Sequence, residues 1–162
     1  ERGGARADLN TMLDELSADV TGRLCDSPLV NATAMPYQAM ARQAGAVADI
    51  LLDIPEDTGR VPDSELCVIV GDLLENAVIA CRGVEKPFIK MRSRCADGLL
   101  TVTLDNSYSR VQQNADGSFQ STREGGGLGL RAIAALVEKH GGGSHFEAKD
   151  GVFYSSVYLR LW

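Results

Sequence analysis

SELCVIVGDLLENAVIACR, residues 64–82, is the most strongly patterned stretch of the sequence. Its apolar residues recur at steps of three and four, the spacing that lines one face of an α-helix. They are Leu66, Ile69, Val70, Leu73, Leu74, Ala77, Ala80 and Cys81. Asp63 or Ser64 is available as the N-cap, and Gly83 as the stop signal. The stretch therefore predicts an amphipathic helix whose apolar face packs on a second layer.

Two β-hairpins are predicted downstream of this helix. Their strands and turns are 87–95 and 99–105 around Asp97-Gly98, then 144–149 and 152–161 around Asp150-Gly151. Asp-Gly pairs favour the tight two-residue turns that join antiparallel strands. Apolar residues at helical spacing predict a further helix from 128 to 140, between the two hairpins.

Three elements are predicted upstream. Residues 1–24 carry an apolar stripe at helical spacing, formed by Leu9, Met12, Leu13, Leu16 and Val20. Such a stripe needs a partner, so we interpret this segment as the end of an upstream element and residues 25–162 as the domain. A helix over 29–44 and a strand from Val47 to Ile54 follow.

The order of these elements predicts the fold class. Helices stand before, between and after strands that lie mostly in hairpins. This arrangement is typical of an α/β two-layer sandwich, with a mixed, mostly antiparallel sheet covered on one face by about three helices. A doubly wound sheet is disfavoured because regular alternation of strand and helix is absent.

Length and charge limit the function. The chain has 162 residues and a net charge of −6, which fits one domain without the broad basic face that non-specific nucleic-acid binding requires. No apolar run approaches the roughly 18 residues that span a bilayer. Residue 1 is Glu and no signal-peptide pattern is present, so we interpret the chain as a piece of a longer protein. The four cysteines form no CxxC pair, which favours reduced thiols over zinc ligands.

Polar residues interrupt the helix of residues 64–82 at Asp72, Glu75 and Asn76. At about 100° per residue, Asn76 lies roughly 80° and Asp72 roughly 120° from the centre of the apolar stripe, whereas Glu75 points nearly opposite. Asp72 and Asn76 therefore share one edge of the buried face. Magnesium is held by one or two protein oxygens plus the phosphates of its nucleotide, so this pair suits Mg-ATP. The alternative is that Asn76 caps a loop and Asp72 is solvated.

The strand over 99–105 ends in polar residues. Asn106 has the same parity as the apolar residues of the strand and is expected to point toward the core, whereas Asp105 points away. An amide at this position suits the amino group of a purine. The alternative is an Asx-turn that begins the next loop, which Asn and Asp favour without any ligand.

A glycine run, EGGGLGL at 124–130, joins the long polar loop from Ser107 to the next helix. Glycines let a backbone approach phosphate oxygens, and the free amides of a helix N-terminus favour anions. The run matches neither a dinucleotide fingerprint nor a P-loop. It predicts a phosphate cradle, with a flexible hinge as the alternative.

Taken together, the three motifs resemble the catalytic and ATP-binding domain of sensor histidine kinases, in the ATPase superfamily shared with DNA gyrase and MutL. Asp72-Leu-Leu-Glu-Asn76-Ala resembles its N box, Leu104–Ser107 the first glycine box and Gly125–Leu130 the second. The resemblance covers about residues 28–161 and implies a Bergerat-type ATP-binding fold.

A finer resemblance is to the quorum-sensing branch related to the staphylococcal Agr receptor. That branch carries the motifs NAIxAC, NS, GxFxST(K/R) and GLGL. The corresponding stretches here are Asn76–Cys81, Asn106-Ser107, Gly117–Arg123 and Gly127–Leu130.

The resemblance implies roles for individual residues. Asn76 would ligate magnesium, and Asp72 would be the catalytic residue that polarises water or the attacking group. The remaining ATP-binding residues would be Asp105, Asn106, Thr122, Arg123, Gly125, Gly127, Leu128 and Gly129. Among them Asn106 would hydrogen-bond the adenine. Its place in the strand alternation turns its side chain toward the core, whereas that of Asp105 turns away. The implied cofactors are ATP and Mg²⁺.

The resemblance also implies partners outside the chain. His140 and His145 stand in no phosphoacceptor context, so both are interpreted as structural or solvated. The phosphoacceptor histidine would lie upstream, on dimerisation helices whose end falls within residues 1–24, and a response regulator would receive the phosphate. The isolated domain would be monomeric and inactive in autophosphorylation. The parent would be a homodimer that carries this domain on the cytoplasmic side of a bacterial membrane.

Two departures from the family pattern leave alternatives open. Ser107 replaces the usual glycine of the first glycine box, and Ile79 stands where many histidine kinases carry lysine. One alternative is therefore a non-catalytic regulatory module. Another is a kinase of the same superfamily that phosphorylates serine.

Overall fold

The computed structural model describes residues 23–109 and 129–162. The helices there are α2 (Pro28–Gln43), α3 (Asp63–Ala80) and α4 (Gly129–Lys139). The strands are β1 (Val47–Leu51), β2 (Phe88–Ala96), β3 (Leu99–Ser107), β4 (Gly143–Lys149) and β5 (Val152–Arg160). The predicted helix over 1–24 lies almost entirely outside the described residues.

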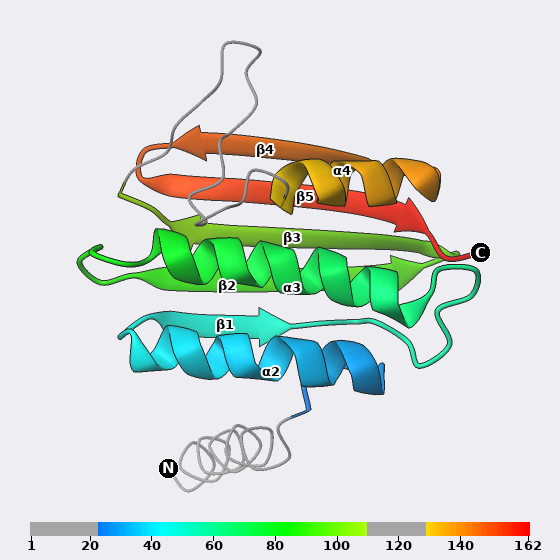
Figure 1. The fold of residues 1–162 in the computed structure, drawn as a ribbon, viewed down its shortest axis with the longest axis horizontal. Coiled ribbons are helices and arrows are strands. Elements are labelled where there is room, and N and C mark those ends of the chain that lie inside the picture. Colours follow the sequence, from blue (N-terminus) through cyan, green and yellow to red (C-terminus); the bar gives the residue numbers. More distant parts are fainter. Residues whose placement is uncertain (1–22, 110–128) are drawn as a thin grey trace, which may run out of the picture.

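The strands form one sheet in the order β1-β2-β3-β5-β4. β1 runs parallel to β2, and the β2–β3, β3–β5 and β4–β5 pairs are antiparallel. Figure 1 shows α2, α3 and α4 side by side on one face of this sheet. The predicted two-layer α/β sandwich with a mixed sheet is confirmed.

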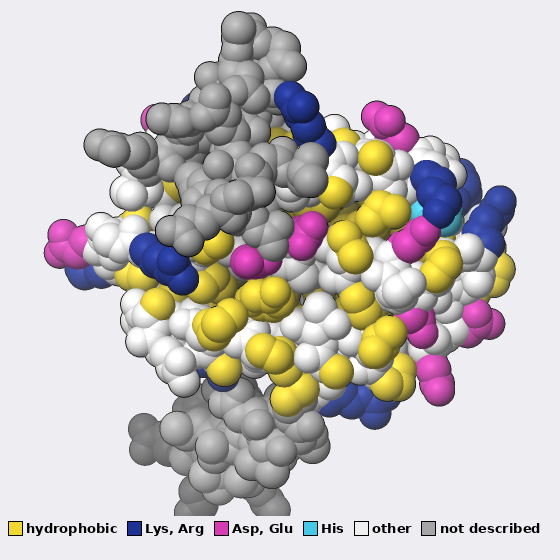
Figure 2. All heavy atoms as spheres, viewed as in Figure 1, with side chains coloured by type: hydrophobic (Ala, Val, Ile, Leu, Met, Phe, Trp, Pro, Cys, Tyr) yellow, Lys and Arg dark blue, Asp and Glu magenta, His cyan; other side chains and the backbone are white. Residues whose placement is uncertain are grey.

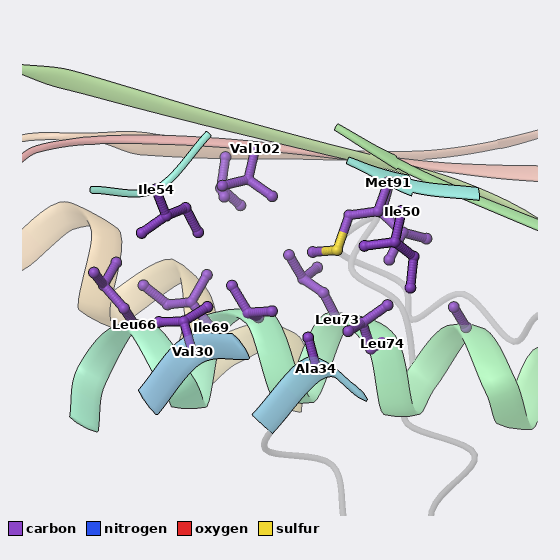
Figure 3. Close-up of a cluster of buried hydrophobic side chains, with 14 of the residues drawn as sticks. Val30, Ala34, Ile50, Ile54, Leu66, Ile69, Leu73, Leu74, Met91 and Val102 are labelled. Atoms are coloured by element: carbon purple, nitrogen blue, oxygen red, sulfur yellow. The ribbon is translucent and has the colours of Figure 1, made fainter. Parts of the chain in front are cut away.

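The core lies between the two layers (Figure 3). In Figure 3, Val30 and Ala34 of α2 lie on the helix side of the core and Ile50 of β1 and Met91 of β2 on its sheet side, and each of these side chains is at most 5% exposed. The apolar stripe predicted for residues 64–82 contributes Leu66, Ile69, Leu73 and Leu74 from α3. This burial, at about 25 cal/mol per Å² of apolar surface, holds the helical layer on the sheet.

Both predicted hairpin turns are confirmed. Asp97 and Gly98 have φ angles of 52° and 75°, and Asp150 and Gly151 have 51° and 78°. Two successive positive φ values define the tight turn whose twist matches that of the strands it joins. The two strands of each hairpin therefore pair directly with one another, β2 with β3 and β4 with β5. The pairing of β3 with β5 joins the two hairpins into one sheet.

The ends of β1 and β3 differ from the prediction. β1 ends at Leu51 rather than Ile54, because the next amides bond outside the ladder: the N–H of Asp53 donates to Ser93 Oγ at 2.7 Å. β3 continues through Ser107 rather than ending at 105, because Asn106 and Ser107 still pair with β5. Tertiary partners, which the local sequence pattern does not specify, set both boundaries.

The predicted N-cap of α3 is wrong. The helix begins at Asp63, the cap position is Pro62, and no side chain caps it. The carboxylate of Asp63 instead accepts a hydrogen bond from Thr58 Oγ1 at 2.9 Å. The Asp63 carboxylate thus anchors the loop before the helix and does not cap the backbone N–H groups of the first turn.

Among the described residues, no helix has the length and apolar character needed to cross a membrane.

Candidate functional site

The helix-facing side of the sheet becomes polar at one end. Along β3 it is lined by the buried apolar residues Leu100, Val102 and Leu104, and then by Asn106, which is only 2% exposed. Ser155 of β5, opposite Leu104, is also buried. Buried polar residues are rare in the described chain, so their clustering at this end marks a candidate polar site.

Ser155 was not predicted as a site residue. Its signal in the sequence is weak: one serine in the inward-facing row of β5 that continues with Val157 and Leu159. Only the pairing of β3 with β5 places it near Asn106, which is opposite Phe153.

The predicted orientations of Asn106 and Asp105 are confirmed. Asn106 is buried on the helix side, and Asp105, of opposite parity, is only partly buried. Asp105 thus lies on the open face of the sheet and does not join Asn106 beneath the helices. The amide Nδ2 of Asn106 donates to the carbonyl of Ser107 at 2.9 Å, which fixes the side chain. The Asx-turn alternative is wrong, because Asn106 is a paired strand residue and the N–H of Tyr108 bonds to Gly151.

The hydroxyl of Ser107 is used within the sheet. Its Oγ accepts a hydrogen bond from the backbone N–H of Phe88 at 2.8 Å, at the first residue of β2. Cys81, the residue just after α3, contacts the same two residues. Its Sγ lies 3.5 Å from the carbonyl oxygen of Phe88 and 3.8 Å from that of Ser107. Burial raises the pKa of the Cys81 thiol, which keeps it a neutral donor. These contacts bring the C-terminal end of α3 to the C-terminal end of β3.

We expect Ser107→Ala to lower the free energy of unfolding by about 1–2 kcal/mol, because it leaves the Phe88 N–H without its side-chain acceptor. Urea unfolding followed by far-UV circular dichroism measures the loss. Ser156→Ala, a partly exposed serine of the neighbouring strand β5, is the matched control and should change stability by less than about 0.5 kcal/mol. Equal effects of the two variants would show that the Ser107 hydrogen bond contributes nothing particular.

Asp72 and Asn76 lie one turn apart on α3 and are both partly exposed, beside the buried Leu73 and Ala77. The side chain of Asn76 makes no hydrogen bond or ion pair with the residues that the structure describes. The proposed loop-capping role of Asn76 is therefore not observed in this part of the chain. Asn76 precedes Cys81 by little more than one helical turn, so the helix motif and the strand motif come to the same end of the domain.

α4 runs antiparallel to α3, with its first residue toward the polar end of the sheet (Figure 1). That first residue is Gly129, which is buried. Free amides at a helix N-terminus favour anions, so this orientation suits a phosphate ligand. Thr122, Arg123, Gly125, Gly127 and Leu128 lie outside the described residues, and their predicted roles stay predictions.

The opposite ends of α3 and α4 are joined by an ionic cluster. Glu65, in the first turn of α3, accepts a hydrogen bond from Lys139 Nζ at 2.5 Å and another contact from the ring of His140. Hydrogen bonding from Lys139, and then from His140, lowers the pKa of the Glu65 carboxyl. The His140 side chain is only 8% exposed, whereas that of His145 is 75% exposed, so the structural and solvated interpretations of the two histidines are confirmed.

Glu65→Gln is expected to destabilise the domain at pH 7 by about 1 kcal/mol, since it removes a charged acceptor from two donors. A lowered folded-state pKa means that this stabilisation is complete above the unfolded value of 4.5 and is lost as the pH falls through the folded value. Urea unfolding at pH 7, 5 and 3 should show the two proteins converging in acid. Glu138→Gln, an exposed neighbour with the same charge change, should show no such convergence.

Comparisons with known proteins agree with this geometry. The family model described as GHKL domain matches residues 63–160. The catalytic domain of histidine kinase ThkA, in a nucleotide-free form, superposes with a TM-score of 0.64 at 18% identity, covering 82% of this chain and 91% of that one. The Acinetobacter baumannii histidine kinase AdeS gives 0.60 at 15% identity, covering 82% and 63%.

The mycobacterial sensor histidine kinase MprB gives a TM-score of 0.56 at 16% identity, covering 82% of this chain and 93% of that one. A sequence search of the curated proteins found no match. At such identities the structural likeness shows the fold, which is that of histidine kinase catalytic domains. The family model spans more than half of the chain, including both α3 motif residues and the two hairpins, and the chain therefore belongs to the GHKL domain family.

Proposed function

We propose that this domain binds Mg-ATP and transfers the γ-phosphate to a histidine carried by dimerisation helices outside this chain. The observation that carries the proposal is the polar end of the helix-facing surface. Asn106 is buried there, and Asn76 stands on the overlying helix with its side-chain amide bonded to no described residue.

The side chains on α3 fit a magnesium site. The amide oxygen of Asn76 is a hard ligand on a partly exposed helix edge, and no described residue competes for it. One protein oxygen suffices, because magnesium in nucleotide sites takes most of its other ligands from phosphates and water. When bound, the ion would offset the negative charge of the phosphate oxygens.

The remaining residues would orient the nucleotide and the acceptor. Asn106 would hydrogen-bond the purine, its amide being already fixed by the Ser107 carbonyl. Gly129 and the glycines before it would place backbone amides against the phosphates, with Thr122 and Arg123 nearby. Asp72 would polarise the attacking group. Transfer breaks the bond between the γ-phosphorus and the oxygen of ADP as a bond to the histidine nitrogen forms, so positioning is the main task of the protein.

The environment of Ser107 bears on the alternative of a non-catalytic module. That alternative drew on Ser107 as a departure from the usual glycine. Here its hydroxyl bonds the first N–H of β2, so the substitution is accommodated inside the sheet. It therefore supplies no reason to expect a failed nucleotide site.

The setting follows from the same proposal. Two copies of the parent protein would associate through the upstream helices, and a response regulator would take the phosphate from the histidine. The domain would then work on the cytoplasmic side of a bacterial membrane. The isolated domain would bind nucleotide as a monomer without phosphorylating itself.

The test has two steps. Binding of a fluorescent ATP analogue to the 162-residue chain should require magnesium and be competed by ATP. A longer protein that includes the upstream helices should then yield acid-labile phosphohistidine when given labelled ATP. Phosphoserine instead would favour the serine-kinase alternative, and nucleotide binding without any phosphoamino acid would favour a regulatory module. No binding at millimolar ATP would contradict the proposal itself.

A further inference from the structure

The outward face of α2 is apolar along its whole length. Leu29, Met35 and Met40 are 50%, 38% and 42% exposed. Ala32, Pro36 and Ala39 between them are exposed as well. No charged residue occurs in the helix before Arg42, in its last turn. Figure 2 shows apolar side chains gathered over this helix.

This face is distinct from the one that builds the core. Val30, Ala34 and Ala41 are the buried residues of α2, and Figure 3 shows Val30 and Ala34 pointing toward α3 and the sheet. At about 100° per residue, Leu29, Pro36 and Met40 lie together on the opposite side of the helix. Single exposed apolar residues are ordinary, but a helix that is apolar on both sides is typical of an element covered on both sides. We call this set of six exposed residues the α2 stripe.

A second copy of the chain is a poor occupant for the α2 stripe. Eleven residues separate Leu29 from Met40, a length of about 16 Å on a helix. With a helix width of about 10 Å the footprint is roughly 160 Å², far below the ~800 Å² per partner of a stable interface. A segment tethered to the same chain needs much less contact area, because its effective concentration is in the millimolar range.

The described chain begins next to the first turn of α2, the turn that carries Leu29. The N–H of Leu24 donates to Asn31 Oδ1, in the first turn of α2, at 2.5 Å, and Arg23 pairs with Asp26 at 2.6 Å. Residues 1–22 therefore join the domain at the end of α2 that carries Leu29. Only residues 21 and 22 lie between Val20 and Arg23, a span of at most about 10 Å, so a helix over 9–20 would end close to the first turn of α2.

The preceding segment has a matching stripe. Leu9 and Val20, the first and last residues of its apolar pattern, are also eleven residues apart. A helix over 9–20 placed antiparallel to α2 would therefore match the stripe in length, at the usual separation of 8–10 Å. We propose that residues 9–20 dock as an amphipathic helix on the α2 stripe and couple the upstream part of the protein to this domain.

Amide hydrogen exchange of residues 9–20 in the 162-residue chain tests this proposal. We expect exchange about tenfold slower than in a synthetic peptide of residues 1–22, as a millimolar effective concentration gives for a local affinity of ~0.1 mM. Leu29→Glu combined with Met40→Lys should bring exchange to the rate of the peptide. This pair preserves the net charge and places an acid near the N-terminus and a base near the C-terminus of α2, which favours the helix itself.

Val47→Glu combined with Leu51→Lys is the matched control. These residues are 71% and 61% exposed on the other face of the sheet, and the pair should leave the protection of 9–20 unchanged. Equal loss in the control, or peptide-like exchange in the unmodified chain, would overturn the proposal. Protection that rises with protein concentration, with dimers in sedimentation, would assign the stripe to a second copy and would also overturn it.

A second measurement tests whether the methionines of the α2 stripe are covered. Docking should shield Met35 and Met40, so Leu13→Glu combined with Leu16→Lys is expected to raise their oxidation rate by hydrogen peroxide several-fold. Unchanged oxidation in this variant would contradict docking, whatever the exchange data show.

Discussion

Asn76→Ala is expected to weaken magnesium-dependent binding of a fluorescent ATP analogue by about 100-fold or more. Even residues that only support a metal ligand typically change metal affinity by about 10- to 100-fold, and Asn76 is proposed as the ligand itself. The fold should survive the substitution, because the Asn76 side chain bonds no described residue and alanine is a better helix former. Titrations with magnesium and with EDTA separate the metal-dependent part of the affinity.

Asn76→Asp is the matched control for this experiment. It keeps an oxygen at the same place on α3 and should retain magnesium-dependent binding. If Asn76→Ala binds the analogue as tightly as the unmodified domain at all magnesium concentrations, Asn76 is not the ligand. An equal loss with and without magnesium would point instead to damage of the nucleotide site as a whole.

Asp72→Asn should separate chemistry from binding. In a protein that includes the upstream helices, we expect the rate of histidine phosphorylation to fall by about 10²- to 10⁴-fold, the usual contribution of a positioned acid or base. Affinity for the ATP analogue should change by less than about threefold, since the proposed role of Asp72 is exerted on the attacking group. Single-turnover phosphorylation at saturating ATP measures the rate directly.

Glu75→Gln provides the comparison within the same turn of α3. It removes a partly exposed carboxylate from the same helix and is expected to leave the phosphorylation rate within about threefold. Similar rate losses in both variants would mean that charge on α3, rather than Asp72 in particular, matters. A loss of nucleotide binding in Asp72→Asn would move this residue from the chemical step to the binding step.

Much of the fold was predictable because its signals are local. The periodicity of residues 64–82 predicted α3, and the pairs Asp97-Gly98 and Asp150-Gly151 predicted both hairpins. Strand parity predicted that Asn106 is buried and Asp105 is not. Each of these inferences depends on a repeat or a turn within a few residues, where side-chain direction follows directly from backbone geometry.

The boundaries and the helix cap were less predictable. β1 was expected to continue to Ile54, but Asp53 bonds to Ser93, forty residues away in the chain. The cap of α3 was assigned to Asp63 or Ser64, but Thr58 engages Asp63. In both cases the competing partner is a side chain that no local pattern identifies. The resemblance to the Agr-receptor branch and the roles of residues 122–128 stay predictions.

From the sequence alone, the chain could be assigned its elements, the faces of its strands and the order of three motifs, because these depend on periodicity and residue chemistry. Tertiary structure alone brought the ends of α3 and β3 together through Cys81, turned the Ser107 hydroxyl to Phe88 and placed Ser155 near Asn106. It also showed that the outward face of α2 is left exposed. Contacts between residues distant in the chain depend on the packing of whole elements, and that packing is a property of the folded domain rather than of any local stretch.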